Sequence, residues 1–87
     1  MSSLAAVTFL GVIAGTLTTA AWLPQVLKTW RSRSAADFSW GYLGMFAAGV
    51  FLWAAYGFIR RDVAVAGANV VTFVLVASVA AVKLGER

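Results

Sequence analysis

Residues 40–82 read WGYLGMFAAGVFLWAAYGFIRRDVAVAGANVVTFVLVASVAAV. Two apolar runs, Trp40 to Ile59 and Val63 to Val82, stand on either side of the charged triplet RRD at positions 60–62. Each run is long enough, as a helix, to cross about 30 Å of hydrocarbon. Because the triplet leaves room only for a tight turn, the stretch predicts an antiparallel hairpin of two membrane-spanning helices. Asp62 is placed to cap the second helix.

A third apolar run, Leu4 to Leu27, precedes the hairpin in a chain of 87 residues that is 62% hydrophobic. Backbone polar groups in lipid are satisfied only in helices or closed barrels, and three segments cannot close a barrel. Met1 to Leu4 carries no basic residue, so we expect a mature helix here rather than a secretory signal. The sequence therefore predicts an all-α membrane protein with one domain over residues 1–87, a bundle of three transmembrane helices at about 4–27, 40–59 and 63–83.

Composition argues against several function classes. The chain contains no cysteine and no histidine, so we expect no disulfide, no metal site and no cofactor. Its net charge of +4 comes from basic residues at the helix ends, which is typical of anchoring in a lipid bilayer and not of nucleic-acid binding. The residues offer no pairing of a nucleophile with a base and no phosphate loop, so an enzyme is not predicted.

The distribution of basic residues predicts the orientation. The first loop and the carboxyl terminus share one side and together carry five, whereas the opposite side carries two. The five are Lys28, Arg31, Arg33, Lys83 and Arg87, and the two are Arg60 and Arg61. Because basic residues gather on the cytoplasmic side, we expect the amino terminus outside and the carboxyl terminus inside.

Small and polar residues indicate how the helices begin and how they pack. The loop from Lys28 to Ser39 ends in Asp37 and Ser39, either of which is suited to cap the second helix. Gly11 and Gly15 form a GxxxG pair on the first helix, and Gly67 leaves the third helix without a side chain at that position. We therefore expect close contacts between helices at these glycines.

Trp53 and Asn69 do not fit a purely structural pattern. Each lies eight residues from Arg61, so the hairpin brings both to one depth, roughly 9 Å below the helix ends. An aromatic face and an amide at one level suit a small polar molecule such as a sugar. The structural alternatives are a large packing side chain for Trp53 and an interhelical hydrogen bond for Asn69. The residues alone leave both interpretations open.

Tyr56 lies one helical turn from Trp53, and Arg60 lies one further turn along the same face. Our hypothesis is that Tyr56, Arg60 and Asp62 form an outer gate, in which Arg60 pairs with Asp62 of the same or another subunit. The alternative is an arginine that reaches the membrane surface beside a capping aspartate.

Pro24 is the only proline in the chain and is followed by Gln25. Its ring and its missing N–H predict a kink between Ala20 and Pro24. Such a kink near one end of a helix is suited to act as a hinge, although a static kink is the simpler interpretation. Gln25 adds an amide that can bond a neighbouring helix or a second subunit.

These residues resemble the PQ-loop membrane proteins and, within them, the bacterial SemiSWEET sugar transporters. The resemblance spans nearly the whole chain. It rests on Pro24-Gln25, Lys28-Thr29, the loop RSRSAADFS at 31–39, Trp53 and Asn69.

The resemblance implies a helix order of 1-3-2 and two parallel protomers that enclose one transport path. It also implies a hinge and inner gate at Pro24 and Gln25, and an extracellular gate at Tyr56, Arg60 and Asp62. A homodimer is expected on physical grounds as well, because three close-packed helices leave no lumen for a solute. First-helix residues near positions 15–19 are expected in the pocket, without a choice among them.

The leading functional prediction is a facilitative, bidirectional transporter of a mono- or disaccharide, such as glucose or sucrose, that works by alternating access in the bacterial inner membrane. Proton coupling is not expected, because none of the three apolar runs contains an Asp, Glu, Lys, Arg or His side chain. One alternative is a proton-coupled PQ-loop carrier of another small metabolite, with Asp37 as the proton site. Another is a non-transporting membrane subunit or receptor.

Overall fold

The structure, a computed structural model, describes residues 3–86. Its helices are α1 (Ser3–Ala20), α2 (Trp22–Ser32), α3 (Trp40–Ile59) and α4 (Val63–Gly85). Residues 3–32, 40–59 and 63–85 are each long and apolar enough to cross a membrane. The prediction of an all-α protein with three transmembrane helices is confirmed. Met1, Ser2 and Arg87, which entered the sequence analysis, lie outside the described residues.

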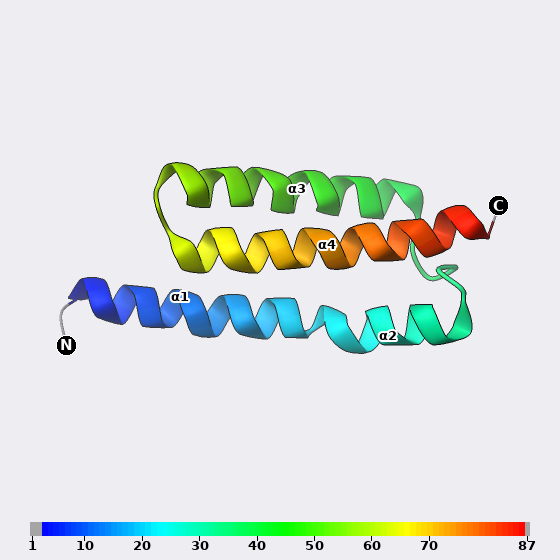
Figure 1. Cartoon of the computed structure of the whole chain (residues 1–87), viewed down its shortest axis with the longest axis horizontal. Helices are drawn as coiled ribbons and strands as arrows, with labels where there is room; N and C mark the ends of the chain where they lie inside the picture. The colour runs from blue at the N-terminus through cyan, green and yellow to red at the C-terminus, as the bar shows by residue number, and fades with distance from the viewer. Residues whose placement is uncertain (1–2, 87) are drawn as a thin grey trace.

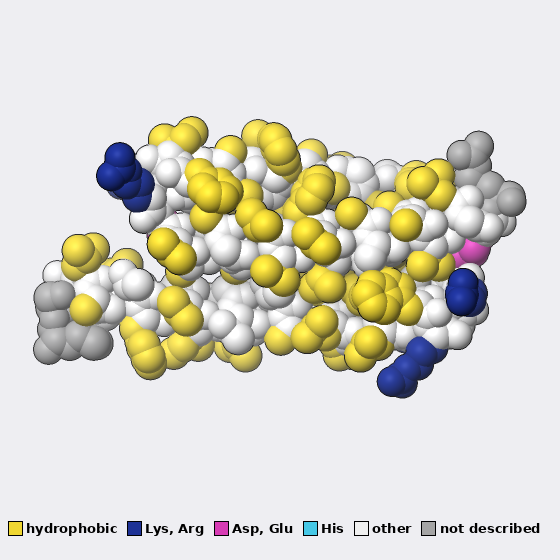
Figure 2. Space-filling model, viewed as in Figure 1, with side chains coloured by type: hydrophobic (Ala, Val, Ile, Leu, Met, Phe, Trp, Pro, Cys, Tyr) yellow, Lys and Arg dark blue, Asp and Glu magenta, His cyan; other side chains and the backbone are white. Residues whose placement is uncertain are grey.

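The three spans lie side by side in a row, with α4 between α3 on one side and the α1–α2 span on the other (Figure 1). This is the predicted order, in which the third span is central. The Cα atoms extend over 51 × 23 × 14 Å. Apolar side chains cover the length of the row, and Lys and Arg side chains stand at its two ends (Figure 2). Because the row is one layer deep, α4 has two flat faces that neither neighbouring span covers.

The two ends of the row differ in their connections. We call the end that carries residues 33–39 the loop end, and the end that carries residues 60–62 the turn end. At the loop end, the ring of Trp22 lies 4.9 Å from that of Phe46 between centroids, so side chains of α2 and α3 meet across α4. The row is therefore bent. We call its inner side, to which Trp22 and Phe46 project, the concave face, and the opposite side of α4 the convex face.

The first span is interrupted at Ala21, between α1 and α2. The prediction of a kink between Ala20 and Pro24 is confirmed, and Pro24 lies in the first turn of α2, where its missing N–H is tolerated. The span continues to Ser32, beyond the expected end at Leu27. It does so because α2 is amphipathic and buries Val26 and Thr29 while its charged side chains stay exposed.

The helix starts follow the predicted capping. Ser39 caps α3, and its hydroxyl accepts a hydrogen bond from the Tyr42 backbone N–H at 3.0 Å. Asp62 begins α4, and its carboxylate accepts from the Val65 N–H at 3.2 Å. Asp37, the other candidate cap for α3, lies 3.9 Å from Lys28 in an exposed ion pair.

The loop at the loop end is held by the last turns of α4. Ala35 is fully buried, and its backbone N–H donates to the carboxylate of Glu86. Lys83 donates to the Ala35 carbonyl at 3.5 Å. Val76 and Val79 of α4 lie fully buried in the apolar cluster beneath the loop. The charged end of α4 therefore anchors the connection between the first and second spans, a role the sequence analysis did not identify.

The backbones of α3 and α4 approach each other very closely at Gly57. A Cβ atom at this position would lie 2.5 Å from the backbone N of Ala66. The predicted contact at Gly15 is confirmed, since a Cβ there would lie 2.8 Å from the Cβ of Ala68. The expectation for Gly67 is wrong, because nothing lies within 4 Å of its Cβ position. Gly67 lies on the convex face, between the helix contacts.

We expect Gly57→Ala to destabilise the fold by about 1–3 kcal/mol, because the added methyl group meets backbone that cannot move aside. The measurement is the free energy of unfolding in detergent micelles. Gly44→Ala is the matched control, since nothing lies within 4 Å of its Cβ position. Equal stabilities for the two variants would show that Gly57 does not set the approach of the helices.

Candidate solute-binding groove

Trp53 of α3 and Asn69 of α4 line the same groove on the concave face, about 390 Å³ in volume. The hairpin geometry predicted that Trp53 and Asn69 lie at the same depth along the spans, and both line this groove. The groove runs across all three spans. Its remaining lining consists of Thr18, Trp22, Met45, Phe46, Gly49, Val50 and Thr72.

The first span contributes Thr18 and Trp22 to the groove. Thr18 falls within the range of residues 15–19 that the sequence singled out, and it lines this groove. Trp22 had no expected role there. Trp22 is half-buried, and its indole stacks on Phe38 at 5.9 Å between ring centroids, so it forms the loop-end wall of the groove.

Asn69 is half-buried and donates one amide N–H to the Val65 carbonyl of its own helix at 2.8 Å. This bond is intrahelical, whereas the structural interpretation from sequence had required an interhelical one. A side-chain amide carries two N–H donors and one carbonyl acceptor. Among the described residues, the second donor and the acceptor have no partner, so both are available to a bound solute.

The indole of Trp53 is 57% exposed in the single chain. Its ring meets that of Tyr56 nearly edge-on, at 83° and 5.5 Å between centroids. Edge-on contact fixes the indole from one side and leaves an aromatic face open. A large, partly open aromatic ring therefore lines this groove within a membrane span.

The lining of the groove is mainly apolar, includes the polar side chains of Thr18, Asn69 and Thr72, and is uncharged. Its lining contains no acidic, basic or histidine side chain. Within residues 3–86, no group of three or more His, Cys, Asp or Glu side chains could hold a metal ion. The groove thus offers an aromatic surface, hydroxyls and an amide, a combination that suits a neutral, hydroxyl-rich ligand.

A threonine pair joins the first span to α4 just before the interruption at Ala21. The hydroxyls of Thr19 and Thr72 lie 2.9 Å apart, and both bond the Ala68 carbonyl, at 3.2 Å and 2.8 Å. These bonds fix α1 to α4. Pro24 and Gln25 come after this link, between the groove and the loop end, and Gln25 makes no side-chain hydrogen bond among the described residues.

The residues of the hypothesised outer gate lie at the turn end, but the expected ion pair between Arg60 and Asp62 does not form within one chain among the described residues. Tyr56 lies against Trp53, while Arg60 and Asp62 form no ion pair in the described part of the chain. The Asp62 carboxylate instead caps α4. Any contact that closes this end must therefore come from a movement or from a second subunit.

The chain is similar to known proteins in sequence and in structure. Residues 6–65 match the family described as the PQ loop repeat. The Escherichia coli protein named sugar transporter SemiSWEET is 43% identical over 77 residues, which cover 88% of this chain and 86% of the relative. The Leptospira biflexa protein of the same name is 40% identical, with coverage of 88% and 91%. A crystal structure of SemiSWEET in the inward-open conformation matches with a TM-score of 0.86 at 40% identity, covering 94% of this chain and 95% of that chain.

Proposed function

The chain belongs to the PQ-loop family, in its SemiSWEET group, and we propose that it is a facilitative, bidirectional sugar transporter of a bacterial plasma membrane. The observation that carries this proposal is the meeting of Trp53 and Asn69 in one uncharged groove midway along the spans. An indole face stacks on the C–H surface of a sugar ring, and an amide both donates to and accepts from its hydroxyls. The SemiSWEET relatives are named sugar transporters, which supports the same substrate class.

The transport unit in this proposal is a parallel homodimer. In a single chain the groove is open on one side, and Trp53 is more than half exposed. A two-fold axis facing the concave side would place a second Trp53 and Asn69 opposite the first pair, because such an interface sets the same patch of both subunits against each other. Two stacking faces and two amides would then surround one sugar of mono- or disaccharide size.

Alternating access follows from the position of the hinge. The link from Thr19 to Thr72 holds α1, and the interruption at Ala21 separates it from α2. Pro24 lacks the N–H that would bond the Ala20 carbonyl, so bending there breaks no hydrogen bond. Movement of α2 about this point would open or close the loop end, while Tyr56, Arg60 and Asp62 gate the turn end.

The orientation proposed for the dimer follows from charge. The loop end carries more basic residues than the turn end and is therefore assigned to the cytoplasm. The amino terminus then lies outside and the carboxyl terminus inside. Pro24 and Gln25 serve the inner gate, and Arg60 and Asp62 the outer one.

We expect Trp53→Ala and Asn69→Ala each to reduce sugar flux to background in proteoliposomes. Because a two-fold dimer carries each substitution twice, a loss of about 1.4 kcal/mol per copy weakens binding roughly a hundredfold. The measurement is uptake of labelled glucose and sucrose. Trp30→Ala and Ser78→Ala are matched controls, since neither residue lines the groove. Normal flux in both groove variants would disprove the site, and no flux of any sugar in the unmodified protein would favour a non-transporting subunit.

Pro24→Ala is expected to slow exchange of sugar across the membrane several-fold while sugar affinity stays near that of the wild type. Alanine restores the N–H that bonds the Ala20 carbonyl, so bending would now cost a hydrogen bond of about 1 kcal/mol. Counterflow rates and equilibrium binding measured on the same preparation separate the two effects. An exchange rate equal to that of the wild type would refute the hinge.

Transport is expected to be independent of a pH gradient, because no titratable side chain lines the groove. The measurement is sugar uptake with an imposed pH gradient and no sugar gradient, with proton movement followed by a dye. Asp37→Asn should change nothing, since Asp37 lies in an exposed loop beside Lys28. Proton movement that accompanies the solute and is lost in Asp37→Asn would support a proton-coupled metabolite carrier instead.

A further inference from the structure

The convex face of α4 plays no part in the proposed sugar site. At 100° per residue, Gly67 and Val71 project about 160° from Asn69 around the helix. A dimer that turns its concave faces inward leaves this side of α4 in contact with lipid. The inference below rests on that arrangement, which belongs to the proposed function.

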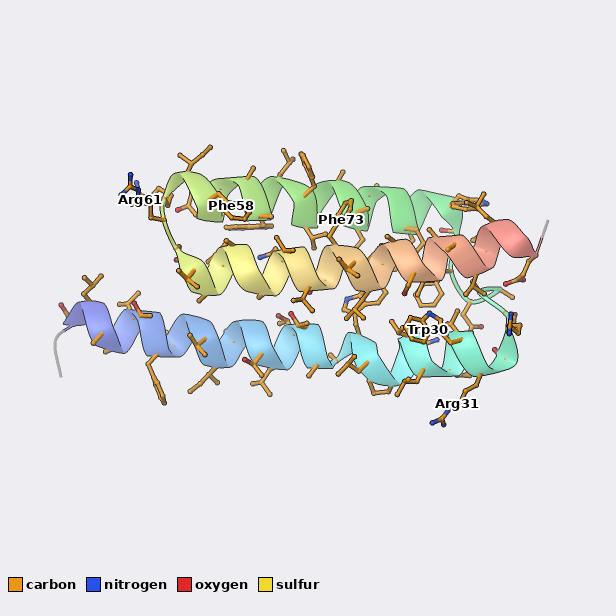
Figure 3. All side chains as sticks on the ribbon, in the orientation of Figure 1. Trp30, Arg31, Phe58, Arg61 and Phe73 are labelled. Atoms are coloured by element: carbon orange, nitrogen blue, oxygen red, sulfur yellow. The ribbon has the colours of Figure 1, made fainter. Side chains whose placement is uncertain are left out.

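An apolar groove runs along the convex face between α3 and α4. It consists of two hollows of about 510 and 360 Å³ that share Phe58 and Val70. Phe58 and Phe73 both lie between the two helices (Figure 3). The larger hollow lies nearer the turn end. Gly67 has no side chain to fill it, and nothing lies within 4 Å of the Gly67 Cβ position. At the end of the groove farther from the turn end, the ring of Phe51 lies 6.2 Å from that of Phe73 between centroids and closes the groove.

The length of the groove matches one leaflet of a bilayer. It extends along α4 from Asp62 to Val74, which is roughly 18 Å at 1.5 Å per residue. Half of the hydrocarbon thickness is about 15 Å. One acyl chain that enters at the turn end would therefore fill the groove and end near the middle of the membrane.

The mouth of the groove is positively charged. Arg61 lines it and stands at the turn end, beyond Phe58 (Figure 3). Its guanidinium forms no ion pair within the described residues. The Asp62 carboxylate nearby is engaged by the Val65 N–H, and Arg60 adds a second positive charge, so the turn keeps a net charge of +1. A guanidinium has the geometry to bind phosphate oxygens in a bidentate manner.

We infer that this groove binds an anionic phospholipid, whose phosphate contacts Arg61 and one of whose acyl chains lies between α3 and α4. The charge of the mouth selects the headgroup, and the apolar lining holds the chain. Both parts of the lipid are needed, because Arg61 is exposed and an isolated arginine near a membrane surface contributes little by itself.

The test is native mass spectrometry of the purified dimer titrated with phosphatidylglycerol and, separately, with phosphatidylcholine. We expect the wild type to retain phosphatidylglycerol more tightly than phosphatidylcholine, and Arg61→Gln to weaken retention of phosphatidylglycerol about fivefold and that of phosphatidylcholine by less, because the choline ammonium already offsets the charge of its phosphate. Arg31→Gln is the matched control, an exposed arginine at the opposite end (Figure 3). Equal losses in the two variants would overturn the proposal, because they would indicate a non-specific surface effect.

A second variant tests the groove itself. Gly67→Leu should weaken retention of phosphatidylglycerol at least fivefold. The added side chain occupies the hollow of about 510 Å³, and its Cβ atom meets no other atom. Ala77→Leu is the control, an exposed residue of α4 outside both hollows. Retention unchanged by Gly67→Leu, or full competition by soluble glycerol phosphate, would show that no acyl chain is bound.

The outcome is separable from that of the transport experiments. Loss of bound phosphatidylglycerol in Arg61→Gln with normal sugar uptake supports the lipid site alone. Absence of retained lipid in the wild type with normal uptake overturns the lipid site and leaves the transport function standing. A wild-type protein that retains phosphatidylglycerol selectively but moves no sugar supports the lipid site without the proposed function.

Discussion

The contact between Gly57 and Ala66 determines the register of the helix hairpin, and the groove depends on that register. The two backbones approach so closely here that no Cβ fits at position 57. Trp53 lies one turn from Gly57 along α3, and Asn69 lies one turn from Ala66 in the opposite direction along the chain. Because the helices are antiparallel, both steps lead to the same level. A close approach one turn earlier or later on either helix would separate the indole from the amide by about 5 Å.

Much of this arrangement was predictable from local sequence. The apolar runs, the charged turn and the two caps at Ser39 and Asp62 are short-range features, and each has a physical cause within a few residues. The level of Trp53 and Asn69 also followed, because a tight turn relates positions on either side of it by counting.

Other features depend on which helix faces meet, and periodicity in an apolar span does not specify this. Trp22 lines the groove, although no sequence feature gave it a role there. Gly67 was predicted to pack against a helix, and it lies on the open face of α4 instead. Lys83 entered the sequence analysis only as a terminal charge, because nothing in the sequence indicates that Lys83 and Glu86 reach Ala35, about fifty residues away in the chain.

The central helix explains why a hinge at Ala21 to Pro24 is mechanically sensible. On one side of the interruption, the Thr19 hydroxyl ties α1 to α4. On the other side, Lys83 and Glu86 tie the loop that follows α2 to the far end of the same helix. The first span is thus attached to α4 at Thr19, just before the interruption, and again through the loop that follows α2. In the proposed movement, α2 would rotate between these two attachments. In the proposed transport cycle, bending would be confined to the segment where Pro24 lacks a backbone hydrogen bond, and α4 would serve as the rigid reference for both halves.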